Sequence, residues 1–130
     1  MVKRYVPRIL LVDSEPRWSR EMEAALEEHG KYDVESVADI DTAFDRTYGD
    51  GFDLILINAA LAFGGANISR FKEIVRMYPD KVLVISDVSS ITTAIKVFKM
   101  GADYADKPFE PRRVVELVTS RLQPELDRAR

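Results

Sequence analysis

Residues 52–58 read Phe-Asp-Leu-Ile-Leu-Ile-Asn, which is the strongest strand pattern in the chain. Residues 54–57 are all aliphatic, so both faces of a strand formed here would be apolar. A strand that is buried on both faces is typical of a parallel sheet with helices on each side. Asn58 then ends the apolar run with an amide. The stretch therefore predicts a central strand of an α/β fold, with a polar group at its carboxyl end.

Four further segments show strand patterns: residues 8–13, 32–37, 82–86 and 102–106. Apolar side chains recur at helical spacing between and after them. These periodic positions include Trp18, Met22 and Leu26 in the first helix, and Ile91, Ala94, Ile95 and Phe98 in the fourth. Residues 62–66, Ala-Phe-Gly-Gly-Ala, are predicted to form a flexible loop. Five strands alternating with five helices predict a doubly wound five-stranded parallel sheet.

The chain has 130 residues, which fits one domain over residues 1–130. We expect its core to span about 8–122, with 123–130 as a tail or the start of a linker. Hydrophobic residues make up 46% and charged residues 32%, as in an ordinary globular protein. The net charge of −3 argues against direct nucleic-acid binding, which normally needs a basic face.

The sequence contains no cysteine, which excludes disulfides, thiolate metal sites and a cysteine nucleophile. The apolar run at residues 9–12 is too short for a signal-peptide core. No stretch approaches the roughly 20 apolar residues of a membrane span. A cytoplasmic location without membrane contact is therefore the expectation.

Polar side chains follow four of the predicted strands. They are Asp13, Ser14 and Glu15 after the first strand, Asn58 at the end of the third, Ser86 and Asp87 at the fourth, and Lys107 after the fifth. Sites in open parallel sheets form at the carboxyl ends of the strands. We therefore expect these side chains to converge at one edge of the sheet.

Four motifs carry a resemblance to the receiver domains of response regulators, the CheY-like superfamily of two-component signalling. They are Ile9–Pro16 (ILLVDSEP), Asp53–Asn58 (DLILIN), Ser86 at a strand end, and Gly101–Phe109 (GADYADKPF). Their order and spacing resemble the family over about residues 8–122. The resemblance implies a flavodoxin-like (CheY-like) sheet of strand order 2-1-3-4-5.

The resemblance also assigns roles to residues at the strand ends. Family members bind magnesium with two adjacent acids and are phosphorylated on an aspartate at the end of the third strand. A hydroxyl residue and a lysine hold the phosphoryl oxygens, and an aromatic residue switches position. Asp13 matches the first acid, Ser86 the hydroxyl residue, Lys107 the lysine and Tyr104 the switch aromatic.

Two positions depart from this pattern. Ser14 stands where the second acid belongs, and Asn58 stands at the phosphoacceptor position. A neutral amide is not a useful nucleophile for phosphoryl transfer and adds no charge for a cation. Magnesium prefers carboxylate oxygens, so at most a weak site at Asp13 and Glu15 would remain. We therefore expect no catalytic residue and no cofactor.

The sequence leaves alternative roles open for the retained residues. Asp13 either contacts weakly bound magnesium, pairs with Lys107 or caps the first helix. Ser14 is the expected N-cap of that helix. Asn58 bonds either to Lys107 or Ser86, or to backbone groups of its own loop.

Two further residues, Ser86 and Tyr104, keep two interpretations each. Ser86 orients a ligand or caps its loop, and Tyr104 either moves between two positions or stays fixed. Asp87 supplies replacement negative charge in one interpretation. His29 has a simple surface or cap role.

These observations predict an atypical receiver, or pseudo-receiver, that acts through protein contacts without aspartyl phosphorylation. It would be a signalling module rather than an enzyme. Its partner would be another protein or an attached output domain, and one arrangement is a homodimer. The surface implied for this contact combines the fourth helix, the fifth strand and the last helix, with Lys96, Val97, Lys99 and Met100 partly exposed. The alternatives are a receiver phosphorylated in an unusual way and a flavodoxin-like module that binds a small ligand.

Overall fold

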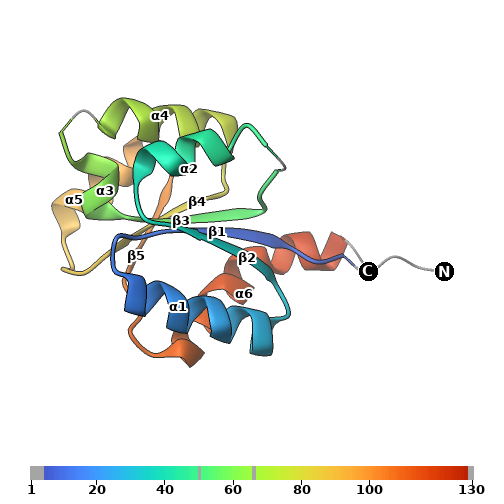
Figure 1. Cartoon of the computed structure of the whole chain (residues 1–130). Helices are drawn as coiled ribbons and strands as arrows, with labels where there is room; N and C mark the ends of the chain where they lie inside the picture. Colours follow the sequence, from blue (N-terminus) through green and yellow to red (C-terminus); the bar gives the residue numbers. More distant parts are fainter. Residues whose placement is uncertain (1–4, 50, 66, 129–130) are drawn as a thin grey trace.

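A computed structural model describes residues 5–49, 51–65 and 67–128, without the side chain of residue 125. Five parallel strands form one sheet in the order β2-β1-β3-β4-β5, which confirms the predicted topology (Figure 1). The strands are β1 (Arg8–Val12), β2 (Asp33–Val37), β3 (Leu54–Asn58), β4 (Val82–Ser86) and β5 (Asp103–Asp106). Because β3 lies between β1 and β4, its aliphatic run is buried on both faces, as the sequence predicts.

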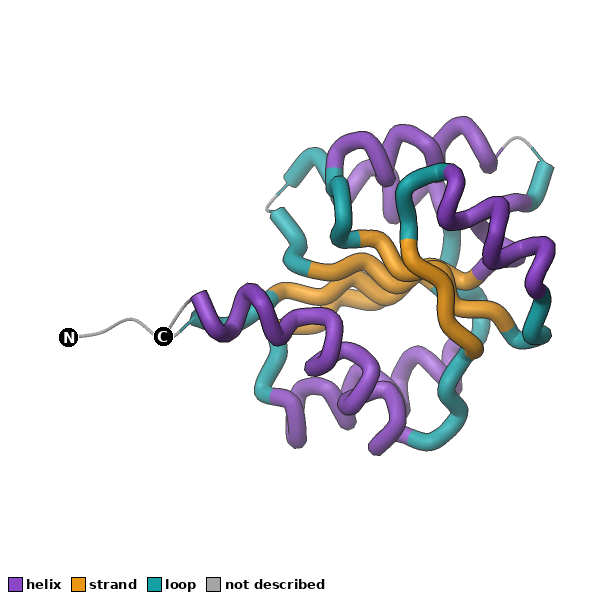
Figure 2. Tube along the Cα trace, turned by 180° about the vertical axis from the view of Figure 1, so that it is seen from behind, coloured by secondary structure: helices purple, strands orange, loops and turns teal. Residues whose placement is uncertain are grey.

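Helices cover both faces of the sheet. They are α1 (Pro16–Ala25), its π-helical continuation η1 (Leu26–Gly30), α2 (Ile40–Arg46), α3 (Ala59–Phe63), α4 (Asn67–Met77), α5 (Ile91–Lys99) and α6 (Pro111–Arg128). Figures 1 and 2 show α1 and α6 on one side of the sheet and α2, α3 and α4 on the other. The result is a three-layer arrangement, in which the sheet lies between two layers of helices.

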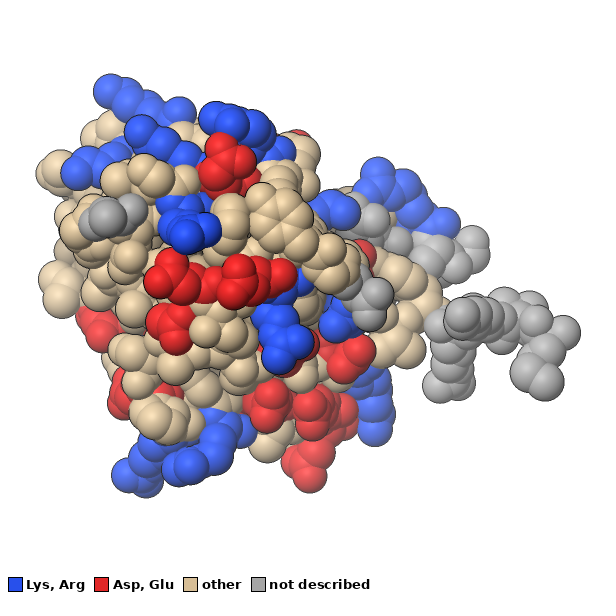
Figure 3. Space-filling view, turned by 45° about the horizontal axis from the view of Figure 1, so that its top comes forward, with Lys and Arg blue, Asp and Glu red and all other residues tan. Residues whose placement is uncertain are grey.

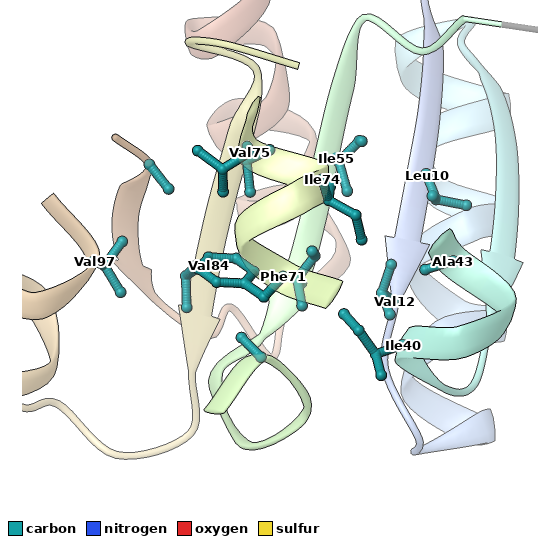
Figure 4. Close-up of a cluster of buried hydrophobic side chains, with 14 of the residues drawn as sticks. Leu10, Val12, Ile40, Ala43, Ile55, Phe71, Ile74, Val75, Val84 and Val97 are labelled. Carbon is teal, nitrogen blue, oxygen red and sulfur yellow. The ribbon is translucent and has the colours of Figure 1, made fainter. Parts of the chain in front are cut away.

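The two faces of the sheet bury separate hydrophobic clusters. Along β1, Leu10 and Val12 point into the cluster under α2 and α4, whereas Ile9 and Leu11 point into the cluster under α1 and α6. This alternation follows from the two-residue period of a strand. Figure 4 shows the first cluster, with Phe71 of α4 packed near Val84 of β4. The scaffold that positions the strand ends is therefore packed from both sides.

The segment after β3 contains a helix where the sequence predicted only a flexible loop. Residues 59–63 form α3, so the prediction of five helices was incomplete. The Asn58 side chain caps this helix by accepting a hydrogen bond from the Ala60 backbone N–H at 2.9 Å. Ala62 is fully buried against the core and holds the short helix in place.

The last helix also differs from the prediction. It continues through Pro124 to Arg128, where the sequence predicted a tail or linker from residue 123. Leu126 packs against the core cluster beyond the proline, so burial outweighs the one backbone hydrogen bond that a proline removes. The last two positions of the predicted tail, 129 and 130, lie outside the described residues. None of the described helices combines the length and the apolar character that crossing a bilayer requires.

The apolar stripe of α5 marks a helix, as its periodicity predicts, but the stripe faces solvent. Ile91 is 81% exposed, Ile95 48% and Phe98 56%. Val97, which the sequence predicted to be partly exposed, is instead fully buried and packs against the core. Lys96 and Lys99 are exposed and Met100 is half-buried, as expected. The periodicity alone could not tell which side of the helix meets the sheet.

Candidate functional site

The polar residues expected at the strand ends do converge at the carboxyl edge of the sheet. Asp13 follows β1, Asn58 ends β3, Asp87 follows β4 and Lys107 follows β5. Because all the strands are parallel, their carboxyl ends share one edge. These four side chains are joined by hydrogen bonds and ion pairs into one cluster.

Lys107 is the centre of this cluster. Its side chain is only 1% exposed, yet its ammonium group lies 2.9 Å from Asp13 Oδ2, 3.1 Å from Glu15 Oε2 and 3.4 Å from Asp87 Oδ1. Burial by itself would lower the pKa of Lys107. Hydrogen bonds to Asp13 and Glu15, with the negative charges of Asp13 and Asp87, outweigh burial and raise that pKa. The ammonium therefore stays charged at neutral pH.

Trp18 closes the inner side of the cluster. The Lys107 ammonium lies 4.6 Å from the centroid of its ring, within the range of a cation–π contact. The Trp18 indole N–H donates to the Pro108 carbonyl at 2.7 Å, which fixes the chain just after Lys107. The sequence indicated Trp18 only as a core residue of the first helix. Its hydrogen-bond partner lies 90 residues further along the chain, and no local spacing signals that contact.

Asn58 is held by all of its polar side-chain atoms. Its Nδ2 donates to Asp13 Oδ2 at 3.1 Å and to Asp87 Oδ1 at 3.2 Å, while Oδ1 accepts from the Ala60 N–H. The expected bond to a backbone group of its own loop is present. The expected bonds to Lys107 or Ser86 were wrong, because the amide turns its N–H groups toward the acids.

The arrangement does not fit a magnesium ion. Asp13 Oδ1 accepts the Glu15 N–H at 2.9 Å, and Asp13 Oδ2 accepts from both Asn58 and Lys107. Asn58 presents N–H groups where a cation needs oxygen. Within residues 5–49, 51–65 and 67–128, no group of three or more acidic, histidine or cysteine side chains is placed to hold a metal.

Ser14 lies outside the cluster, and its expected role as the N-cap of α1 was wrong. The N-cap is Glu15, without a side-chain capping bond, and Pro16 occupies the first helical position. Proline suits that position because it has no N–H to satisfy. Ser14 itself is exposed, and the carboxylate of Asp13 receives the Glu15 N–H.

Ser86 and Tyr104 meet at one backbone carbonyl. Ser86 Oγ donates to the Val88 carbonyl at 2.7 Å and accepts the Val88 N–H at 3.3 Å, which is the loop-capping role. Tyr104 donates its hydroxyl to the same carbonyl at 3.3 Å and accepts the Ser90 N–H at 3.0 Å. The loop from β4 to α5 is thereby tied to β5, and Asp87 of the same loop joins it to the cluster.

The comparison with protein families agrees with this geometry. The model of the response regulator receiver domain family matches residues 9–119. This chain belongs to that family. It is a receiver domain of two-component signalling, and the matched residues include every member of the cluster at the sheet edge. The comparison with curated proteins gives no match.

Solved structures of other receiver domains share the fold of this one. A CheY-like receiver domain protein from Methanospirillum hungatei has a TM-score of 0.81 at 22% identity, with 95% of this chain and 99% of that chain covered. A response regulator from Thermotoga maritima has a TM-score of 0.77 at 25% identity, with 92% and 99% covered. NtrX from Brucella abortus has a TM-score of 0.79 at 24% identity, and the match covers 95% of this chain but 29% of NtrX.

We expect Lys107→Met to lower the free energy of unfolding by about 3–5 kcal/mol, because the buried Asp13 carboxylate loses its counterion. Chemical denaturation at neutral pH measures this loss. Adding Asp13→Asn to Lys107→Met should restore part of it.

Comparison of the wild type with Lys107→Met also tests the raised pKa of Lys107. A pKa above the unfolded value means that the stabilisation is full below about pH 10.4 and is lost as pH rises through the folded pKa. The wild type should therefore lose more stability at alkaline pH than Lys107→Met. Equal alkaline losses in the two proteins would contradict this assignment.

Proposed function

We propose that this receiver domain is a pseudo-receiver, which acts through protein contacts and is not switched by aspartyl phosphorylation. The observation that carries the proposal is the environment of Asn58. Its two N–H groups donate hydrogen bonds to Asp13 and Asp87, and its oxygen caps α3. The residue at the phosphoacceptor position is thus a structural donor within a closed cluster.

The chemistry of phosphoryl transfer supports this proposal. An aspartate nucleophile needs a free carboxylate oxygen and positive charge to offset the charge that builds on the phosphoryl oxygens. Asn58 offers no carboxylate. The ammonium of Lys107 is already shared by three acids and is buried. A phosphoryl group would have to break these contacts to gain the donors that it needs.

The exposed stripe of α5 supports action through protein contacts. Ile91, Ile95 and Phe98 lie on one face of the helix, and Val88, 73% exposed, precedes it. Exposed apolar residues that gather on one face mark interaction surfaces. The loop that leads into α5 is hydrogen-bonded to Tyr104 of β5. The contact surface that we propose is α5 with β5 and α6. A second copy of the chain is the occupant that we propose to test first.

An attached output domain is the other arrangement that fits the proposal. NtrX, which matches this chain over 29% of its own length, contains further sequence beside its receiver-like part. By analogy, this domain would pass a signal to an output unit through the same surface.

One observation favours a second candidate, a receiver phosphorylated on another acid. Asp87 is 58% exposed on its side chain and lies 3.4 Å from the Lys107 ammonium. Ser86 precedes it and retains the hydroxyl of the family pattern. Asp87 is therefore the acid to monitor in any phosphorylation assay.

We expect no mass gain when the wild type is incubated with magnesium and a small phosphodonor such as acetyl phosphate. We also expect no change in Trp18 fluorescence on adding beryllofluoride, because Asn58 cannot coordinate it. Trp18 is the single tryptophan and contacts Lys107, so it reports on the site directly. Asn58→Asp should gain a magnesium-dependent fluorescence change, because it adds a carboxylate between Asp13 and Asp87.

Stoichiometric phosphorylation of the wild type within the cluster would contradict the pseudo-receiver proposal. Loss of that phosphorylation in Asp87→Asn would establish the second candidate instead. A conventional receiver domain, labelled in parallel, serves as the control for the phosphodonor.

We expect the wild type to self-associate with rising concentration in sedimentation equilibrium, and Phe98→Asp to remain a monomer. A charge on the exposed stripe opposes burial of that stripe in an interface. Phe98 is 56% exposed, so the thermal stability of the variant should change little. A wild type that is strictly monomeric at every concentration would remove the homodimer from the proposal.

A further inference from the structure

A groove runs between the carboxyl-terminal ends of α4 and α5, at the edge of the sheet opposite Asn58. Its volume is about 630 Å³. Apolar walls come from Val75, Pro79 and Met100, and the charged residues that line it are three cations and one acid: Lys72, Arg76, Lys99 and Asp80. Gly101 lies at its end with φ +92°, a conformation that L side chains rarely adopt.

Positive charge is concentrated on these two helices. α4 carries three cationic residues and one acid, and α5 carries two cationic residues and no acid, so together they bear four net positive charges. The whole chain has a net charge of −3. Figure 3, which brings the top of the molecule forward, shows Lys and Arg side chains gathered along the upper edge of the view. The α4–α5 layer is therefore a basic region of an acidic protein.

Helix stability accounts for only part of this charge, and not for Lys72. Lys72 and Arg76 are four residues apart on α4, and like charges at this spacing destabilise a helix by about 0.2–0.5 kcal/mol. The helix dipole favours Arg76 and Lys99, which lie in last turns, but not Lys72. Arg76 pairs with Glu73, whereas Lys72 and Lys99 have no ion-pair partner among the described residues. Two cations without an ion-pair partner, Lys72 and Lys99, thus lie beside the apolar walls of the groove, which fits a surface that binds an anionic partner.

We propose that this groove docks an acidic protein segment that carries an apolar side chain as its anchor. The acidic groups would face Lys72, Arg76 and Lys99, and the apolar side chain would cover Val75 and Met100. A free phosphate would leave the apolar walls unused. Nucleic acid fits less well, because no aromatic residue lines the groove for base stacking and the chain as a whole is acidic.

The docking site is independent of the pseudo-receiver proposal. It lies at the amino edge of the strands, whereas Asn58 and Lys107 lie at the carboxyl edge. It also differs from the α5 stripe, since Lys99 and Met100 belong to the groove and Ile91, Ile95 and Phe98 do not. A variant of the groove should therefore leave self-association unchanged.

Fluorescence anisotropy with a short fluorescein-labelled peptide, in which Leu stands between Glu and Asp residues, tests the proposal. The groove variant is Lys72→Glu with Arg76→Glu. The matched control is Arg17→Glu with Arg20→Glu, which makes the same change in net charge on exposed positions of α1. Circular dichroism checks that both variants fold, and amide chemical shifts of residues 72–76 and 99–101 locate the bound peptide.

We expect the groove variant to weaken peptide binding about tenfold or more, and the control pair to change it by less than about threefold. Replacing the peptide's Leu by Ser should also weaken binding, because the apolar walls lose their partner. The proposal is overturned if the peptide does not bind, if both charge variants weaken it equally, or if a single-stranded oligonucleotide or inorganic phosphate binds the groove more tightly than the peptide.

Discussion

An ammonium group that is almost fully buried needs compensating charge and hydrogen-bond acceptors around it. Lys107 is such a group, and the residues at the carboxyl edge of the sheet have to supply these partners. Asp13, Glu15 and Asp87 do so from the ends of two other strands. The Trp18 ring also lies against the ammonium, and its indole N–H donates to the Pro108 carbonyl just after the lysine. The strand order, which places β3 beside both β1 and β4, is what brings these groups within reach.

The charge balance of the cluster explains the structural role of Asn58. Three carboxylates surround one ammonium, which leaves an excess of negative charge at the cluster. The Asn58 amide donates to Asp13 and Asp87 and so separates two acids that would otherwise repel each other. An aspartate in the same place would add a fourth carboxylate and would require a cation to offset it. The neutral amide thus adds no further negative charge to the cluster, and its oxygen caps the start of α3.

The sequence predicted the sheet well, because aliphatic runs such as residues 54–57 admit few other structures, and polar residues after parallel strands necessarily share an edge. The strand order came from the family resemblance. The two acid partners of Asn58 were not predictable, since they lie 45 and 29 residues away and depend on the rotamer of the amide. The exposed stripe of α5 was missed because periodicity identifies a helix but not the side that meets the sheet. Helix α3 was missed because its N-cap, Asn58, is also the last residue of β3.

Nitrogen–proton NMR of the Asn58 side-chain amide and the Lys107 ammonium tests the closed cluster most directly. A buried ammonium held by three acids exchanges its protons slowly, so both groups should give resolved signals at neutral pH. The account predicts that neither signal shifts when magnesium and then beryllofluoride are added at saturating concentration. Displacement of the Lys107 signal by magnesium, or a large shift of the Asn58 amide with beryllofluoride, would show that the site still receives the ligands of an active receiver and would contradict the account.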